Sequence, residues 1–179
     1  MILWFNKVFW AIRLAIGFIA LLWGVHAISA LGLLDKVGII PRSQSGVLGI
    51  LLAPLLHANL HHLLANSIGM AGFFVIFALA EAEKMLTVFT VVYLVHGLLV
   101  WVVARPGNHL GASGLVFGLF GYLVFLGFFK KQLRYLLISA CVLCLYGGMF
   151  WGVLPVSSFV SWESHLCGLL TGAVLAKYL

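Results

Sequence analysis

Charged residues are scarce in this chain. Only 8% of its 179 residues are Asp, Glu, Lys or Arg, and just four of them are acidic. A soluble domain carries roughly a quarter charged residues. A chain that is 64% hydrophobic therefore cannot cover a water-facing surface, and we interpret it as an integral membrane protein. Its ten basic residues give a net charge of +6, but they are scattered between apolar runs and form no groove for nucleic acid.

Cysteine is scarce as well. Cys141, Cys144 and Cys167 lie in apolar segments, and no second pair exists to complete a zinc site. We expect all three to be small buried residues. The first apolar run is longer than a signal-peptide core and no small-residue cleavage site follows it, so we expect it to be a span and not a cleavable signal peptide.

Long apolar runs are abundant. A helix needs roughly 20 residues to cross about 30 Å of hydrocarbon. The sequence predicts an all-α membrane protein, a single compact bundle of six transmembrane helices over residues 1–179, with spans at about 8–30, 60–80, 85–104, 113–129, 135–154 and 164–179.

The first two spans are joined by a long connection, about residues 31–59. It contains Asp35-Lys36, Pro41 and Pro54, yet also the apolar stretch 46–56. It is too broken to span, and backbone at membrane depth must pack against protein. We expect an interfacial or partly membrane-inserted hairpin.

Basic residues favour one side of the predicted bundle. The side that carries the termini holds seven of them and the opposite side three, the seven being Lys7, Arg13, Lys84, Lys130, Lys131, Arg134 and Lys177. The positive-inside rule then predicts that both termini are cytoplasmic.

Polar residues gather at the opposite side, where the second, fourth and sixth spans begin. Ser113 opens the fourth span and His165 the sixth, while His62 and Asn66 lie one turn apart at the start of the second. Each alone has a commoner role, as a packing residue for the serine and an interfacial hydrogen-bonding group for the histidines. Polar residues inside a membrane are costly, and the coincidence of four at one depth indicates a functional site.

Glycines predict how this site closes. Gly168 and Gly172 continue the face of His165 at one-turn spacing, and Gly114 begins a similar face after Ser113. Small residues let membrane helices approach closely. Packing of the two faces would carry His165 within reach of Ser113.

The chemistry expected of these groups is nucleophilic. A serine attacks when a base takes its proton, and His165 is the candidate base for Ser113. No carboxylate is placed to orient the imidazole, because Glu81 and Glu83 lie on the wrong side and Glu163 is expected in a loop. The pattern predicts a Ser-His dyad.

A developing oxyanion needs donors placed in advance. Asn66 and His62 offer side-chain N–H groups, and Ser113 lies where the first N–H groups of a helix lack partners. Gly111 lets the chain turn sharply and leaves room for a substrate backbone.

Histidine-based alternatives are weaker. His57 and His61 are spaced i,i+4 and could share a metal, but no HExxH motif or acidic partner accompanies them. These histidines would support a transporter or a haem protein. We expect no metal and no cofactor.

Three motifs together resemble the rhomboid intramembrane serine proteases. They are Gly111-Ala112-Ser113-Gly114, His62-x-x-x-Asn66 and His165-x-x-Gly168-x-x-x-Gly172, in the fourth, second and sixth spans. The layout resembles the compact bacterial GlpG type without its cytosolic N-terminal domain. The resemblance implies cleavage of transmembrane protein substrates near the periplasmic face of the bacterial inner membrane. It makes Ser113 the nucleophile, His165 the base, and His62 and Asn66 oxyanion donors.

The resemblance also implies partners and a gate. The partners expected are a transmembrane substrate and the lipid bilayer, with no nucleic acid and no obligate protein partner. The fifth span and the loop after it, about residues 147–161, would form a movable gate and cap. Two departures are Gly49-Ile50, where relatives often carry Trp-Arg, and Ser164, where Ala is common before the histidine. The alternative, a non-catalytic rhomboid-like binder of membrane segments, is disfavoured because Ser113 and His165 are both present.

Overall fold

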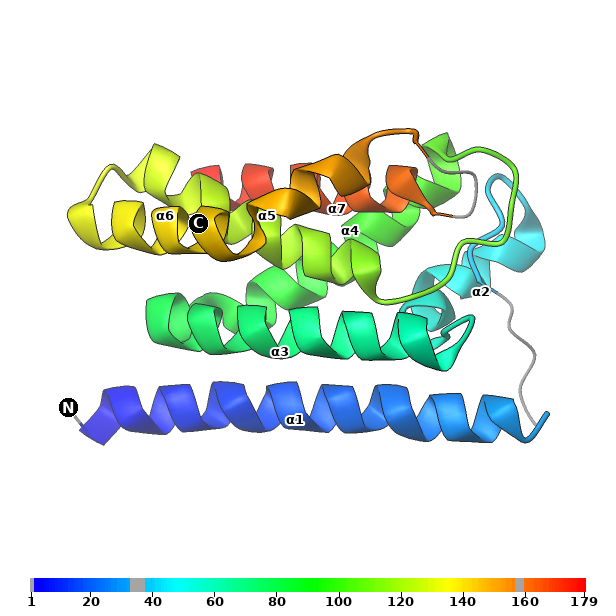
Figure 1. The fold of residues 1–179 in the computed structure, drawn as a ribbon, viewed down its shortest axis with the longest axis horizontal. Helices are drawn as coiled ribbons and strands as arrows, with labels where there is room; N and C mark the ends of the chain where they lie inside the picture. The colour runs from blue at the N-terminus through cyan, green and yellow to red at the C-terminus, as the bar shows by residue number, and fades with distance from the viewer. Residues whose placement is uncertain (1, 33–37, 157–159) are drawn as a thin grey trace.

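The computed structural model describes residues 2–32, 38–156 and 160–179, and it is a bundle of helices (Figure 1). In chain order the α-helices and 3₁₀ segments are α1 (Ile2–Ala30), α2 (Gln44–Leu52), η1 (Ala53–Leu55), α3 (Leu60–Glu81), η2 (Ala82–Lys84), α4 (Met85–Val103), α5 (Ser113–Lys130), α6 (Leu133–Tyr146), η3 (Gly147–Val153) and α7 (Trp162–Tyr178). The expectation of an all-α membrane bundle is confirmed.

Four stretches of the described chain are long and apolar enough to cross a bilayer: Phe5–Ala30, Leu60–Val103, Ser113–Lys130 and Leu133–Val153. The second of these comprises α3 and α4, which run in opposite directions on either side of η2 (Figure 1). The 17 residues of α7 reach about 26 Å, close to the thickness of the hydrocarbon core.

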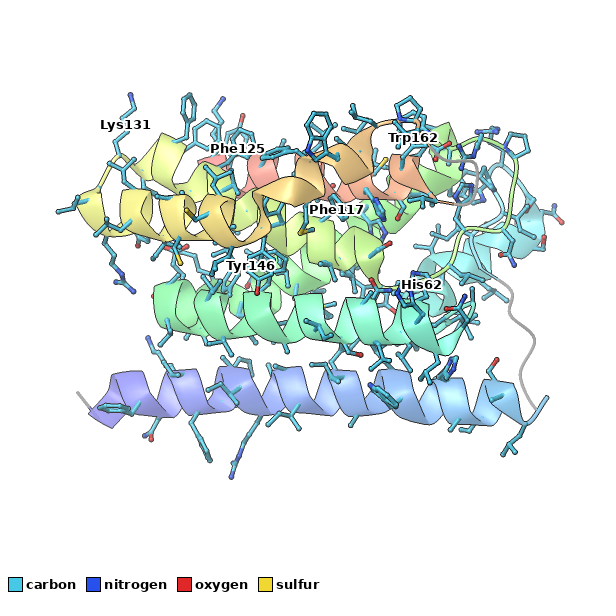
Figure 2. The ribbon with its side chains drawn as sticks, viewed as in Figure 1. His62, Phe117, Phe125, Lys131, Tyr146 and Trp162 are labelled. Carbon is cyan, nitrogen blue, oxygen red and sulfur yellow. The ribbon has the colours of Figure 1, made fainter. Side chains whose placement is uncertain are left out.

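The helices alternate in direction, so α3, α5 and α7 all begin at one end of the bundle and both termini lie at the other (Figure 1). Figure 2 shows His62 of α3 and Trp162 of α7 toward the first end and Lys131, after α5, at the opposite end. Polar residues near the starts of α3, α5 and α7 therefore share one end of the molecule.

The described part of the connection between α1 and α3, which the sequence predicts to be an interfacial or partly inserted hairpin, contains regular structure. It contains α2, which is capped by Ser43, whose hydroxyl accepts from the Gly46 N–H at 3.0 Å. The backbone of Ile39 pairs with that of His109 in an isolated β-bridge. These bonds fasten the connection to the loop that leads into α5. Asp35 and Lys36 lie outside the described residues.

The central helix is α5, whose side chains are almost all buried from Gly114 to Leu123. Its largest buried residues, Phe120 and Tyr122, pack against Phe73 and Phe77 of α3. By contrast, α6 buries only Ser139 and Val142. Most of the other side chains of α6 face outward.

Cysteine placement differs from the expectation. Cys167 is buried, but Cys141 and Cys144 are exposed on α6. The prediction of burial for these two was wrong because α6 is apolar on every side. In a membrane an apolar face can point to lipid as readily as to the core.

A buried carboxylate joins four segments at the end of the bundle that carries the termini. Glu81 accepts from Lys84 Nζ at 2.7 Å and from the hydroxyl of Tyr135 at 3.1 Å, and the Tyr122 hydroxyl donates to its other oxygen. Lys84 also donates to the Leu179 carbonyl at 2.7 Å. This cluster fixes the start of α6 and the C-terminal residue to α3 and α5.

Candidate active site

The approach to α5 brings His62 and Asn66 against Gly111. Gly111 has φ of +112°, in the region that favours glycine, and its N–H bonds the Ala53 carbonyl at 2.8 Å. A Cβ on Gly111 would stand 2.6 Å from His62 Nε2 and 3.5 Å from Asn66 Nδ2. Both side chains therefore face the backbone two residues before Ser113. His62 is set by its helix start, because the Asn59 side chain caps α3 by accepting from the His62 N–H at 2.9 Å.

Unpaired donors collect at this point. Asn66 is buried, and its Nδ2 makes no hydrogen bond within the described part of the chain. α5 has no side-chain N-cap bond, and no acceptor is found for the backbone N–H of Ser113 or Gly114 among the described residues. Buried donors are normally paired. A cluster of free ones suits an anionic oxygen at a helix N-terminus.

His57, which the sequence suggested only as a metal ligand shared with His61, lies at the candidate site. Its buried ring lies edge-on to His62, with centroids 5.1 Å apart, and its Nε2 accepts from the Ala112 N–H at 3.5 Å. Burial lowers the pKa of His57 to about 4, with charge repulsion from His62 adding to the effect. A neutral His57 can accept this bond, and so it positions the backbone immediately before Ser113.

Helices α5 and α7 are in backbone contact. A Cβ on Gly168 would overlap the Gly114 carbonyl, and one on Gly172 would overlap the Gly118 carbonyl. Only glycine allows this approach. Because Gly168 follows His165 by one turn, the contact brings the first turns of α5 and α7 together.

His165 is held from two sides. Its Nδ1 lies 2.8 Å from the Gly152 carbonyl of η3, and its ring stacks on Phe117 with centroids 4.0 Å apart and planes 6° apart. A carbonyl oxygen only accepts, so Nδ1 carries the hydrogen and Nε2 keeps its lone pair. This is the tautomer that a general base requires. A backbone carbonyl thus orients the imidazole, a role that a carboxylate usually has. No side-chain pattern could have revealed this carbonyl.

Ser113 is half-buried at the first position of α5. Its hydroxyl makes no hydrogen bond with any residue the structure describes, His165 included. Catalytic hydrogen bonds are often long in free enzymes and tighten when substrate binds. The structure therefore places Ser113 and His165 on the touching first turns of α5 and α7, without a hydrogen bond between them.

The position of Glu163 differs from the one that the sequence predicts. It was expected in a loop, but it lies in the first turn of α7 and is buried. Its Oε1 is 3.5 Å from Arg105 Nε and accepts from the Arg105 N–H at 3.4 Å. His109 Nδ1 lies 2.6 Å from the Ser161 hydroxyl. These contacts tie the start of α7, two residues before His165, to the loop that leads into Ser113.

The remaining histidines do not form a ligand set. His57 is next to His62 and not to His61, which is exposed. His96 is buried, with Nδ1 3.1 Å from the Val92 carbonyl, and its ring lies against Gly114. No group of three or more His, Cys, Asp or Glu residues that could hold a metal ion occurs within the described ranges.

The fold and the site together define a multi-pass membrane protein of the rhomboid family, to which this chain belongs. The family model described as Rhomboid domain matches residues 44–179, from α2 to the end of α7. This range includes every candidate site residue. Membership supports intramembrane proteolysis at the level of the family.

Relatives are found in several bacteria. An uncharacterized protein of Mycobacterium tuberculosis is 36% identical over 173 residues, which cover 90% of this chain and 72% of that protein. A similar protein of Mycobacterium leprae is also 36% identical over 173 residues, covering 90% and 68% of the two chains. A Bacillus subtilis protein named "Putative rhomboid protease YdcA" is 35% identical over 132 residues, covering 68% and 62%.

Proposed function

We propose that this protein is an intramembrane serine endopeptidase that cleaves transmembrane segments of membrane proteins with a Ser113–His165 dyad. The observation that carries the proposal is the cluster of unpaired donors beside the serine. Asn66 Nδ2 and the first N–H groups of α5 lie next to a half-buried hydroxyl, and His165 on the neighbouring helix offers a free Nε2.

The chemical steps follow from these positions. His165 Nε2 takes the Ser113 proton as Oγ attacks the scissile carbonyl. The carbonyl oxygen becomes an oxyanion, which Asn66, His62 and the Ser113 N–H stabilise. The imidazolium then gives its proton to the leaving amine, and the C–N bond breaks to leave an acyl-serine. Water, deprotonated by His165, attacks the acyl-serine, and His165 returns that proton to Ser113 Oγ as the ester bond breaks and the carboxylic acid is released.

The glycines have two tasks in this proposal. Gly111 lets His62 and Asn66 lie against the backbone that leads to Ser113, while Gly114, Gly168 and Gly172 keep α7 against α5. The distribution of basic residues supports an orientation with both termini in the cytoplasm and the active site toward the periplasmic side of a bacterial inner membrane. The bilayer and a transmembrane substrate are the only partners that the mechanism needs.

The test uses purified protein in detergent with a model transmembrane substrate. Ser113→Ala and His165→Ala are expected to abolish cleavage, and a fluorophosphonate probe is expected to label Ser113 of the unmodified protein. Ser45→Ala, an exposed serine on α2, serves as the matched control. Cleavage that survives in either dyad variant would refute the mechanism. Normal substrate binding with no cleavage or labelling in the unmodified protein would favour the non-catalytic binder.

The oxyanion donors are tested separately. Asn66→Ala is expected to lower kcat about 10²–10³-fold, because one preorganised donor typically contributes that much. His61→Ala is the control for His62→Ala, since His61 is the exposed neighbour on the same turn. Equal loss of activity in the two histidine variants would remove His62 from the oxyanion site.

A further inference from the structure

A cleft opens between α1 and α4, away from the candidate active site. It has a volume of about 300 Å³ and is lined on α1 by residues one turn apart, Arg13, Gly17 and Leu21, and on α4 by Met85 and Phe89. The two helices pack on α3, and the edge-on contact of Phe18 with Phe89, with centroids 4.9 Å apart, is where they approach each other. All the side chains that line the cleft are apolar except that of Arg13.

Arg13 is exposed on this face of a membrane span, and nothing in the described chain neutralises it. The three described acidic residues pair with other cations, and Arg13 makes no ion pair or hydrogen bond with a described residue. Its guanidinium lies over the Phe9 ring, 4.4 Å from the centroid. An arginine reaching toward its own helix N-terminus is snorkelling toward the headgroup region. A charge at this depth without a counter-ion is costly, so an anion from the membrane is the natural partner.

The lining of the cleft indicates its occupant. Its walls are apolar and its charged group is Arg13, so an apolar chain that carries an anionic group matches both. A flexible acyl chain fits between apolar walls. Gly17 supports this, because a Cβ there would meet nothing within 4 Å and its face of α1 is open.

We propose that this cleft is a binding site for an anionic phospholipid. The lipid phosphate binds the Arg13 guanidinium at the mouth, and the first part of one acyl chain lies between α1 and α4 along Gly17. The planar guanidinium suits a phosphate because it can donate two parallel hydrogen bonds. The site lies at the end of the bundle that carries the termini, in the leaflet opposite the candidate active site.

The test measures lipid binding to the detergent-purified full chain by native mass spectrometry, with phosphatidylglycerol and phosphatidylcholine of matched acyl chains. The unmodified protein is expected to bind phosphatidylglycerol at least about tenfold more tightly. Arg13→Gln is expected to abolish this preference, and Gly17→Leu, which fills open space, is expected to weaken binding of both lipids. Lys177→Gln is the matched control, because Lys177 is a basic residue at the same end that also lies over a ring, that of Tyr178.

The outcomes separate the possible occupants. Binding that is equal for the two lipids, unchanged in Arg13→Gln, or lost equally in Lys177→Gln would overturn the proposal. Glycerol 3-phosphate that competes as well as the intact lipid would show a headgroup site alone and would also overturn it. A concentration-dependent dimer that Gly17→Leu disrupts would assign the cleft to a second copy of the chain. Thermal unfolding of both cleft variants, expected to match the unmodified protein without lipid, excludes misfolding as the cause.

Discussion

Replacing Gly152 with alanine would add one methyl group between the two contacts that hold His165. The new Cβ would stand 2.7 Å from Phe117 Cζ and 3.3 Å from His165 Nδ1. Ordinary contact begins at 3.4 Å, so the Phe117 ring must retreat by about 0.7 Å and the imidazole stacked on it must follow. Gly152 is not among the glycines with positive φ, so alanine causes no backbone strain there.

The expected effect is on catalysis more than on folding. A misplacement of about 1 Å in a catalytic group can cost about 10²-fold, so Gly152→Ala is expected to lower kcat about tenfold to a hundredfold. KM and the melting temperature should stay close to their starting values. The assay is cleavage of a transmembrane substrate in detergent, together with the rate of fluorophosphonate labelling at Ser113.

Two further variants sharpen this experiment. Gly148→Ala is the control, because a Cβ on Gly148 of the same 3₁₀ segment would meet nothing within 4 Å. Phe117→Leu removes the atom that the new methyl group strikes, so adding it to Gly152→Ala should restore part of the labelling rate. Labelling and cleavage by Gly152→Ala at the unmodified rate would refute the argument that the Gly152 carbonyl and Phe117 position His165 as the base.

Three other predictions follow from the contacts. Gly168→Ala, whose methyl would overlap the Gly114 carbonyl, is expected to lower the free energy of unfolding by about 1–3 kcal/mol, measured by denaturant titration in detergent; an unchanged midpoint would contradict the backbone contact. The lowered pKa of His57, about 4 against 6.5, means that the unfolded chain binds more protons between these values. Stability should therefore fall as the pH drops from 6.5 to 4, and less so in His57→Gln; melting curves with equal pH dependence in both proteins would refute this. Joint replacement of Phe150 and Trp151 by alanine should raise the cleavage rate if they restrain a gate, whereas unchanged or slower cleavage by a folded variant would argue against one.

The membrane helices could be predicted closely from the sequence, because apolar length is a direct physical signal. The predicted second span, 60–80, corresponds to α3 at Leu60–Glu81, and the predicted fourth, 113–129, to α5 at Ser113–Lys130. The predicted fifth span, 135–154, corresponds to the apolar stretch Leu133–Val153, within which the α-helix ends at Tyr146 and continues as the 3₁₀ segment η3. Hydropathy does not detect the change from α-helix to 3₁₀-helix, because it alters hydrogen bonding and not composition.

Only the parts of the candidate site that consist of side chains could be predicted from the sequence. The spacing of His62 and Asn66 and the depth of Ser113 and His165 placed those residues at one end of the bundle. The Gly152 carbonyl is a backbone group that every residue possesses, so its contact with His165 cannot be recognised from a residue type. The stacking of Phe117 on His165 has no signal either, because an aromatic residue on an apolar helix is ordinarily a core residue. Glu163 was missed because its pairing with Arg105 depends on how the first turn of α7 meets the loop after α4.

The buried cluster around Glu81 has a mechanical consequence for α6. Tyr135 and Arg134 anchor the first turn of α6, the latter donating to the Leu79 carbonyl at 2.9 Å, whereas η3 at its far end buries no residue. The rod from Leu133 to Val153 is about 35 Å long, from 14 α-helical and seven 3₁₀ residues. A tilt of only about 5° about the anchored turn would displace the Gly152 end by about 3 Å, roughly the length of the hydrogen bond to His165. The cluster thus fixes one end of α6, and a tilt of α6 about this end would shift the Gly152 carbonyl relative to His165.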